Sequence, residues 1–237
     1  MTDRTDLDIQ RAYARLAGLM YLVVLTSSIA GLIVTSSVGA GPGFAERSTQ
    51  IMASESLFRI GLVLALVGSL GTVLLAVALY VTVRPVDKNL ALVGLLFRIC
   101  ESAIGETGLA LSFGILQLRS ATAAGAGFAA GEWQALFDVL NGAATTEVAA
   151  IFFSLGSTVF FYLLLRSRYI PRVLAGVGLV GSACYAAMWI ARLIWPELSW
   201  IAPIASVPIL IAEVLGGLWL LFRAIHVAGV STAANPR

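Results

Sequence analysis

The chain has 237 residues, of which 59% are hydrophobic and 12% are charged, and its mean hydropathy is +0.93. Soluble globular domains are about 45–50% apolar and about 25% charged, so the composition excludes a separate soluble domain and indicates an integral membrane protein. The small net charge of +2 gives no indication of a nucleic-acid partner.

A membrane-spanning helix requires about 20 mostly apolar residues, because each residue advances about 1.5 Å through a hydrocarbon core about 30 Å thick. Six segments satisfy this requirement: residues 14–36, 57–82, 90–117, 147–165, 173–194 and 203–224. We therefore predict an all-α, polytopic membrane protein whose six transmembrane helices form one bundle and one domain, residues 1–237. The first segment is longer than the hydrophobic region of a typical signal peptide and is expected to remain uncleaved.

Two connections between these segments are long. The first covers residues 37–56 and ends with Ser54 and Glu55, which are suited to cap the N-terminus of the second span. In the second, residues 119–146, large apolar side chains recur at the spacing of one helix face: Trp133, Leu136, Phe137 and Leu140. We predict a short interfacial helix there on the outer membrane face, with a lid over an outward cavity as the alternative.

The distribution of basic residues predicts the orientation. With the N-terminus in the cytoplasm, most Lys and Arg residues fall inside: Arg4, Arg11, Arg15, Arg84, Lys88, Arg166, Arg168, Arg172, Arg223 and Arg237. Only Arg47 and Arg119 then fall in the outer connections. Following the positive-inside rule, we expect a multi-pass protein of the inner (plasma) membrane with both termini cytoplasmic.

Four stretches of the sequence together resemble a known family. They are RLAGLMYL (15–22), SESLFRIG (54–61), ALYVTVRPVDKNLALVGLLFRICES (78–102) and EVLGGLWLL (213–221). The chain resembles the bacterial six-span membrane proteins grouped as the domain of unknown function 4386 family, nearly from end to end and in the same order. The resemblance implies a bacterial six-helix integral membrane protein, and it implies no activity, cofactor or catalytic residue.

Seven ionisable residues fall within the predicted spans or at their outer ends. They are Arg59, Arg98, Glu101, Glu106, Glu147, Arg192 and Glu213. An ionised side chain at the bilayer centre costs roughly 2.5–3.5 kcal/mol, so such residues usually face the bundle interior, pair with one another and mark functional sites. We therefore take these seven as a candidate intramembrane polar site.

Helical geometry predicts how these residues associate. Arg98, Glu101 and Glu106 project from one half of the third span, and Arg98 and Glu101, at positions i and i+3, are expected to pair. Depth in the membrane predicts a central cluster of Arg98, Glu101 and Glu213. It also predicts an outer cluster of Arg59, Glu106, Glu147 and Arg192, to which Glu55 is a further candidate. In that outer cluster, Glu106 is expected to pair with Arg59 or Arg192.

Three hypotheses for the function remain open. The charges form structural contacts between helices or hold a ligand; or they belong to a small proton-coupled transporter of an anionic or amphipathic solute; or they serve an intramembrane enzyme acting on a lipid or isoprenoid. No HExxH, GxSxG or aspartyl pair supports the enzyme, so no catalytic residue, cofactor or metal site is predicted. The expected partners are the lipid bilayer and a small-molecule or lipid ligand.

Overall fold

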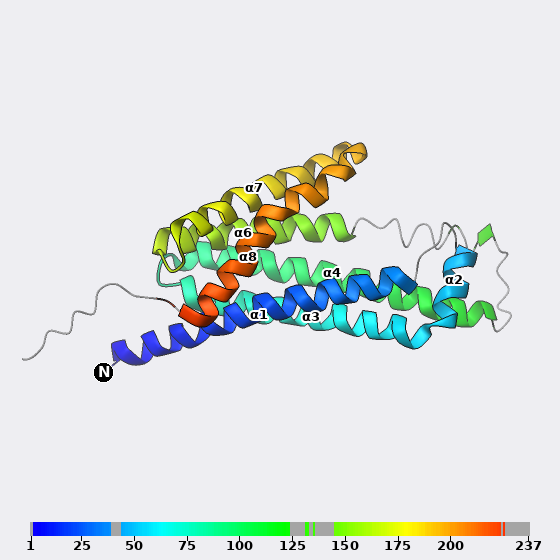
Figure 1. Cartoon of the computed structure of the whole chain (residues 1–237), viewed down its shortest axis with the longest axis horizontal. Helices are drawn as coiled ribbons and strands as arrows, with labels where there is room; N and C mark the ends of the chain where they lie inside the picture. Colours follow the sequence, from blue (N-terminus) through cyan, green and yellow to red (C-terminus); the bar gives the residue numbers. More distant parts are fainter. Residues whose placement is uncertain are drawn as a thin grey trace, which may run out of the picture.

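The computed structural model describes residues 2–38, 44–123, 131–132, 135, 145–223 and 225. These residues are helical and contain no strand, so the all-α prediction is confirmed (Figure 1). The elements in chain order are α1 (Thr2–Val38), α2 (Phe44–Ala53), α3 (Glu55–Val83), α4 (Lys88–Ala123), α6 (Thr145–Ser167), α7 (Arg172–Ile194), the 3₁₀ helix η1 (Pro196–Ile201) and α8 (Ala202–Arg223). The interfacial helix predicted between residues 119 and 146 lies almost entirely outside the described residues.

Five of the helices are long and apolar enough to cross a membrane, which confirms the prediction of a membrane protein. The five segments are Thr5–Val38, Glu55–Val83, Thr146–Ser167, Arg172–Ile194 and Ala202–Arg223. Helix α4 has 36 residues, among them Arg98, Glu101 and Glu106, and it is not among the five, so the predicted count of six spans is not confirmed. Helix α1 begins at Thr2, well before the predicted residue 14, because the polar N-terminal residues continue the helix beyond its apolar part.

The connection predicted at residues 37–56 contains a helix of its own, α2, and a single residue separates α2 from α3. Ser54 is that single residue and occupies the N-cap position, with Glu55 in the first turn as predicted, but its side chain makes no capping hydrogen bond. The backbone N–H of Ser54 donates to the carbonyl of Ile51 at 3.2 Å, at the end of α2. The chain therefore enters α3 from a helical turn, whereas a capping serine normally has an extended backbone.

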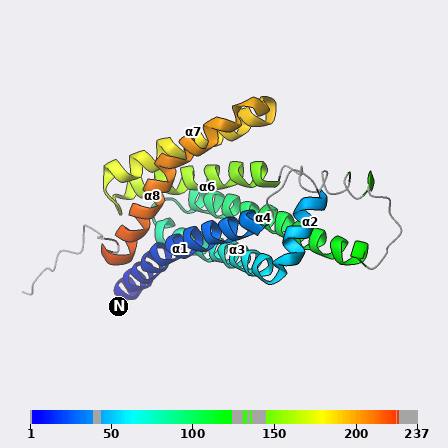
Figure 2. The ribbon, with the colours of Figure 1, turned by 45° about the vertical axis from the view of Figure 1, so that its right-hand side comes forward.

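The six long helices form a closed ring (Figures 1 and 2). Following the ring, α1 packs on α3, α3 on α4, α4 on α6, α6 on α7, α7 on α8, and α8 again on α1. The start of α1, the α3–α4 turn and the α6–α7 turn lie at one end of the molecule (Figure 1). At the other end, α7 and α8 diverge from α1 and α3 (Figures 1 and 2).

Glycines fix the place where α1 and α8 cross. A Cβ atom added at Gly18 of α1 would lie 2.5 Å from the carbonyl oxygen of Gly217 and 2.5 Å from the backbone nitrogen of Leu221, both in α8. Backbone atoms cannot swing away as a side chain can, so only glycine permits this approach. The close crossing sits at the compact end of the ring, and the two helices separate from there.

Two apolar clusters of different size form the core of the molecule, one toward each end. The large cluster surrounds the crossing and includes Tyr21, Leu79, Phe160, Leu164 and Leu220. The small cluster packs α2 against its neighbours and consists of Val38, Ile51, Phe58, Leu62 and Leu116, with Leu109 and Phe113 beside it. The middle of the ring, between these clusters, is where the candidate site residues of α4 and α8 lie.

Candidate functional site

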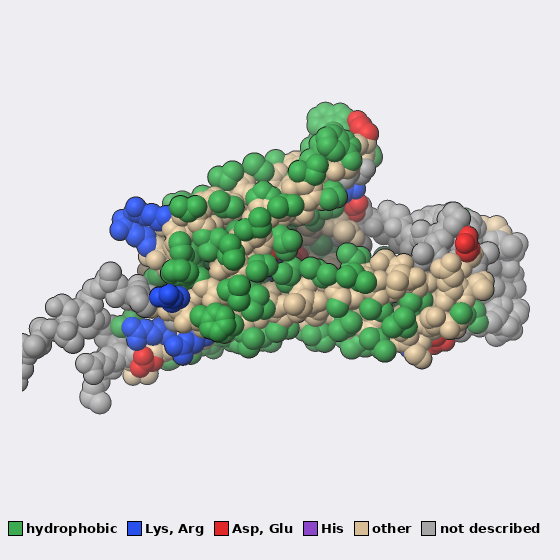
Figure 3. Space-filling view, in the orientation of Figure 1, with side chains coloured by type: hydrophobic (Ala, Val, Ile, Leu, Met, Phe, Trp, Pro, Cys, Tyr) green, Lys and Arg blue, Asp and Glu red, His purple; other side chains and the backbone are tan. Residues whose placement is uncertain are grey.

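A cavity of about 880 Å³ lies inside the helix ring. It extends from the large apolar cluster to the small one, because members of both, such as Tyr21 and Phe58, line it. Its walls come from α1, α3, α4, α6 and α8, with Tyr185 from α7. Figure 3 shows the corresponding face of the molecule hollowed between α1 and α8.

Arg98 is placed at this cavity by a glycine on the neighbouring helix. Its residue surface is 2% exposed. A Cβ added at Gly156 of α6 would lie 2.9 Å from both Cγ and Cδ of Arg98, so the missing side chain makes room for the arginine stem. The guanidinium carbon lies 4.9 Å from the centre of the Phe153 ring, a favourable cation–π arrangement.

Arg98 and Glu101 form the predicted ion pair within α4. Arg98 Nη1 lies 3.0 Å from Glu101 Oε2. The arginine side chain is 3% exposed and the glutamate side chain 18% exposed, so the carboxyl is the more accessible partner of the two. Because both residues line the cavity, this accessible part of Glu101 faces the hollow centre of the ring.

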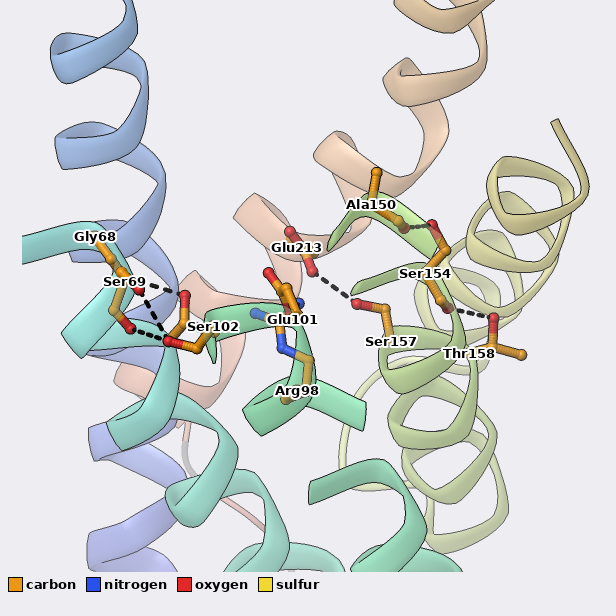
Figure 4. A network of polar contacts seen from close by, with 11 residues as sticks. Gly68, Ser69, Arg98, Glu101, Ser102, Ala150, Ser154, Ser157, Thr158 and Glu213 are labelled. Carbon is orange, nitrogen blue, oxygen red and sulfur yellow. Dashed lines mark hydrogen bonds and ion pairs between the residues drawn. The ribbon is translucent and has the colours of Figure 1, made fainter. Parts of the chain in front are cut away.

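Glu213 reaches the same place from α8. Its Oε1 accepts a hydrogen bond from Ser157 Oγ of α6 at 3.2 Å, and it too lines the cavity. Figure 4 shows the side chains of Arg98, Glu101 and Glu213 converging from α4 and α8. The charge of Arg98 interacts electrostatically with both carboxyl groups. The structure thus brings together the three residues of the predicted central cluster.

The four residues of the predicted outer cluster do not form one group. Arg59 pairs with Glu55 of the same helix at 2.7 Å, and this pair is half exposed. Arg192 lies 3.6 Å from Glu147, joining α7 to α6, and its guanidinium stacks on Trp189 at 4.4 Å. Each arginine pairs with a neighbouring carboxylate, so the pairs Arg59–Glu55 and Arg192–Glu147 are present in place of the expected cluster.

Glu106 is separate from all of these groups. It is partly buried, does not line the cavity and makes no ion pair with any described residue. The predicted pairing of Glu106 with Arg59 or Arg192 is therefore wrong. Successive residues of a helix are about 100° apart, so Glu106 points well away from Gly105, which does line the cavity.

Several hydroxyl groups that brace the cavity walls were not among the predicted site residues. Ser69 of α3 and Ser102 of α4 are hydrogen-bonded at 2.9 Å (Figure 4). Thr158 of α6 donates to Ser182 of α7 at 3.0 Å. Hydrogen bonds of this kind between helices contribute about 0.6 kcal/mol each in membrane proteins. Ser102 could have been predicted as a wall residue from its place on the polar half of α4. No sequence pattern distinguished Ser157 or Ser182 from the other serines of the chain.

The described residues contain no group of three or more His, Cys, Asp or Glu side chains that could hold a metal ion. Cys100 and Cys184 are free and exposed on the helix surfaces. This arrangement can bind a polar group at Glu101 and Glu213. It can also accommodate an apolar group along the cavity walls.

The comparisons with known proteins give one positive result. No curated protein and no solved structure matches the chain significantly. A family model described as a domain of unknown function matches residues 16–224, which include all seven candidate site residues. The chain therefore belongs to the DUF4386 family of membrane proteins.

Proposed function

We propose that this protein holds an amphipathic small molecule or lipid in its central cavity, with the polar group of the ligand at Arg98, Glu101 and Glu213. The single observation that carries this proposal is the cavity of about 880 Å³ with one charged cluster on its wall. Ligand sites are usually concave and largely apolar, with a few polar groups that fix the orientation of the ligand. Leu25, Leu62 and Leu109 are among the apolar residues that would contact its apolar part.

The proposal includes α4 as a sixth transmembrane span and the whole chain as one domain. Helix α4 packs between α3 and α6 in the ring, and its 36 residues correspond to about 54 Å. Its most buried charge, Arg98, points into the ring rather than toward lipid. This is the usual arrangement for ionisable residues of a membrane-spanning helix.

We also propose that both termini face the cytoplasm of a bacterium and that the membrane is its inner membrane. The Lys and Arg side chains gather at the end of the molecule where α1 begins (Figure 3). The α3–α4 and α6–α7 turns at that end carry Arg84, Lys88, Arg166, Arg168 and Arg172. Such an excess supports a cytoplasmic location for this end.

A purely structural role for the charges is the main competing explanation. A buried ion pair is weak evidence for stability, but it can fix the register of packed helices. A structural cluster is expected to be enclosed by protein on all sides. Glu101 and Glu213 instead border a cavity large enough for a small molecule, and this favours the ligand-holding role.

Proton-coupled transport of the ligand is a second candidate function. The specific observation in its favour is that two carboxyl groups from different helices, Glu101 and Glu213, border the same cavity beside one guanidinium. A carboxyl group in this position can exchange a proton when a ligand binds or leaves. Solute flux into proteoliposomes driven by a pH gradient, and abolished by Glu213→Gln, would support transport.

Photolabelling tests the ligand-holding proposal. The probe is an uncharged long-chain alcohol with a photoactivatable diazirine, and labelled peptides are identified by mass spectrometry. Gly105→Phe fills the cavity, because Gly105 lines it and a Cβ added there meets nothing within 4 Å. Gly114→Phe is the matched control, since Gly114 is in the same helix, has the same free space and does not line the cavity.

We expect cavity-lining peptides of α1, α3 and α4 to be labelled in the wild type and in Gly114→Phe. Labelling of these peptides should fall severalfold in Gly105→Phe, while labelling of lipid-facing peptides stays constant. Equal labelling of the cavity peptides in both variants would contradict the proposal, because the probe would then be reacting from the bilayer.

A further inference from the structure

The charges of the cavity are unbalanced. Among the cavity-lining residues that the structure describes, the charged side chains are one arginine and two glutamates: Arg98, Glu101 and Glu213. If all three are ionised, the site carries an excess of one negative charge. In a water-poor cavity such an excess is unfavourable unless a cation, including a proton, compensates it.

The positive charge of Arg98 is already engaged by the protein. Its Nη1 is 3.0 Å from Glu101, its guanidinium carbon lies over Phe153, and its side chain is only 3% exposed. The Nε and Nη1 atoms have almost no accessible surface, and neither has a hydrogen-bond partner among the described residues, so it is burial that keeps a ligand from them. An anion in the cavity would therefore meet little of the guanidinium, and it would lie beside two carboxyl groups.

Glu213 is the carboxyl group with the least compensation. Its hydrogen-bond donor, the Ser157 hydroxyl, carries no charge, and no Lys or Arg of the described chain lies within ion-pair distance of it. Glu101, by contrast, shares its charge with Arg98. The carboxyl group of Glu213 and the accessible side of Glu101 are therefore the charged surface that a ligand meets, among uncharged hydroxyl groups of the wall.

Aromatic side chains line the same cavity as these carboxyl groups. Tyr21 of α1, Phe153 of α6 and Tyr185 of α7 all line the cavity, and Phe153 and Tyr185 pack edge to face at 6.3 Å. The face of an aromatic ring attracts a cation and repels an anion. The face of Phe153 is covered by the guanidinium of Arg98, so the rings of Tyr21 and Tyr185 are the aromatic wall groups that favour a cation over an anion in this cavity.

We propose that the ligand of this cavity is an amphipathic organic cation whose positively charged group lies against Glu213 and Glu101. This inference rests on the proposed function and specifies the chemical class of its ligand. Glu213, from α8, supplies the less compensated of the two negative charges. The apolar part of the cation lies along the Leu-lined walls, on the side where the cavity opens between α1 and α8 (Figure 3).

A pair of lipophilic ions of matched shape and opposite charge tests this inference. Tetraphenylphosphonium and tetraphenylborate are titrated separately into the purified full-length protein in a mild nonionic detergent, and binding is measured by isothermal titration calorimetry. We expect the phosphonium to bind at least about tenfold more tightly than the borate, because only the cation gains from the carboxyl groups.

Three variants assign the selectivity to Glu213. Glu213→Gln keeps the size of the side chain and removes its charge, and it should weaken phosphonium binding by about tenfold or more. Glu213→Asp keeps the charge and should retain the preference for the cation. Glu106→Gln removes a carboxyl group of α4 that does not line the cavity, and it should leave binding unchanged. Helical circular dichroism and size-exclusion profiles establish that each variant is folded.

Tighter binding of the borate would overturn the inference and show an anion site at Arg98. Equal binding of both ions, with no effect of Glu213→Gln, would also overturn it, since the cavity would then select only for apolar surface. Absence of phosphonium binding would overturn it as well. The proposed function fails separately, because its test uses an uncharged probe whose labelling does not depend on Glu213.

Discussion

Arg98 shows how a charged residue is accommodated inside an apolar bundle. The stem packs in the space left by Gly156, the guanidinium lies on Phe153, and Glu101 supplies the countercharge one helical turn away. Each of these contacts offsets part of the penalty for removing a guanidinium from water. Because the penalty is large, the environment of Arg98 is stable only while its partner carboxylate is present.

A double-variant comparison tests this interdependence. Arg98→Met leaves Glu101 without its ion partner and should lower the free energy of unfolding by about 3–5 kcal/mol. The double variant Arg98→Met/Glu101→Met removes both charges and should recover much of that loss, because it buries apolar side chains of similar length. Unfolding by titration with sodium dodecyl sulfate, followed by circular dichroism, measures both. A double variant as unstable as the single one would contradict the interdependence of the two charges.

The sequence was sufficient to predict the Arg98–Glu101 pair, because residues at i and i+3 of one helix are neighbours in any fold. It was not sufficient for contacts that depend on how helices cross, such as Gly156 against Arg98 or Ser157 against Glu213. The prediction for Glu106 was wrong for a related reason. Helical projection assigned it to a broad polar half, whereas the cavity takes a narrower sector of α4 that excludes Glu106.

At the scale of the helices, the shape of the cavity depends on where α1 and α8 touch. Contact at Gly18 and Gly217 brings the middle of α1 against the C-terminal part of α8. From that point the two helices diverge (Figure 1). The opening between them is therefore a consequence of a glycine crossing near the middle of α1 and in the C-terminal part of α8.

Gly18→Ala tests the importance of this crossing. The added methyl group would lie 2.5 Å from backbone atoms of α8, so the helices must separate, and the free energy of unfolding should fall by about 1–3 kcal/mol. Gly176→Ala in α7 is the control, because a Cβ added there meets nothing within 4 Å and alanine favours a helix. Unfolding in the same detergent titration compares the two. If Gly18→Ala were as stable as the control, the close approach would not be important for packing.

The bounds of the long helices could be predicted well, since the length of an apolar stretch is a property of the sequence alone. The predicted segments 57–82 and 173–194 correspond closely to α3 and α7. Helix α2 was missed because its ten residues are too few and too polar for the criterion of a membrane span. Its apolar residue Ile51 becomes recognisable as core only when it packs beside Phe58 and Leu116.

At the scale of the whole molecule, the two ends have different chemistry. Arginine and lysine side chains gather at the compact end (Figure 3). Near the other end, beside the start of α8, Trp195 and Trp200 are 52% and 67% exposed. Tryptophan is enriched where a membrane meets water, and Lys and Arg are enriched on its cytoplasmic side. This polarity supports the proposed orientation, in which the wide part of the ring lies on the outer side.

Substituted cysteines test the orientation and the sixth span together, in a background where Cys100 and Cys184 are replaced by alanine. Asn89 and Gln117 are exposed residues near opposite ends of α4. Residue 117 is 28 positions after residue 89, which corresponds to about 42 Å of helix, more than the hydrocarbon core of a bilayer. We expect a membrane-impermeant maleimide to label Gln117→Cys in intact cells and to label Asn89→Cys only after the cells are permeabilised. Labelling of both positions from the same side would show that α4 does not span the membrane, whereas the reverse pattern would preserve the span and invert the proposed orientation.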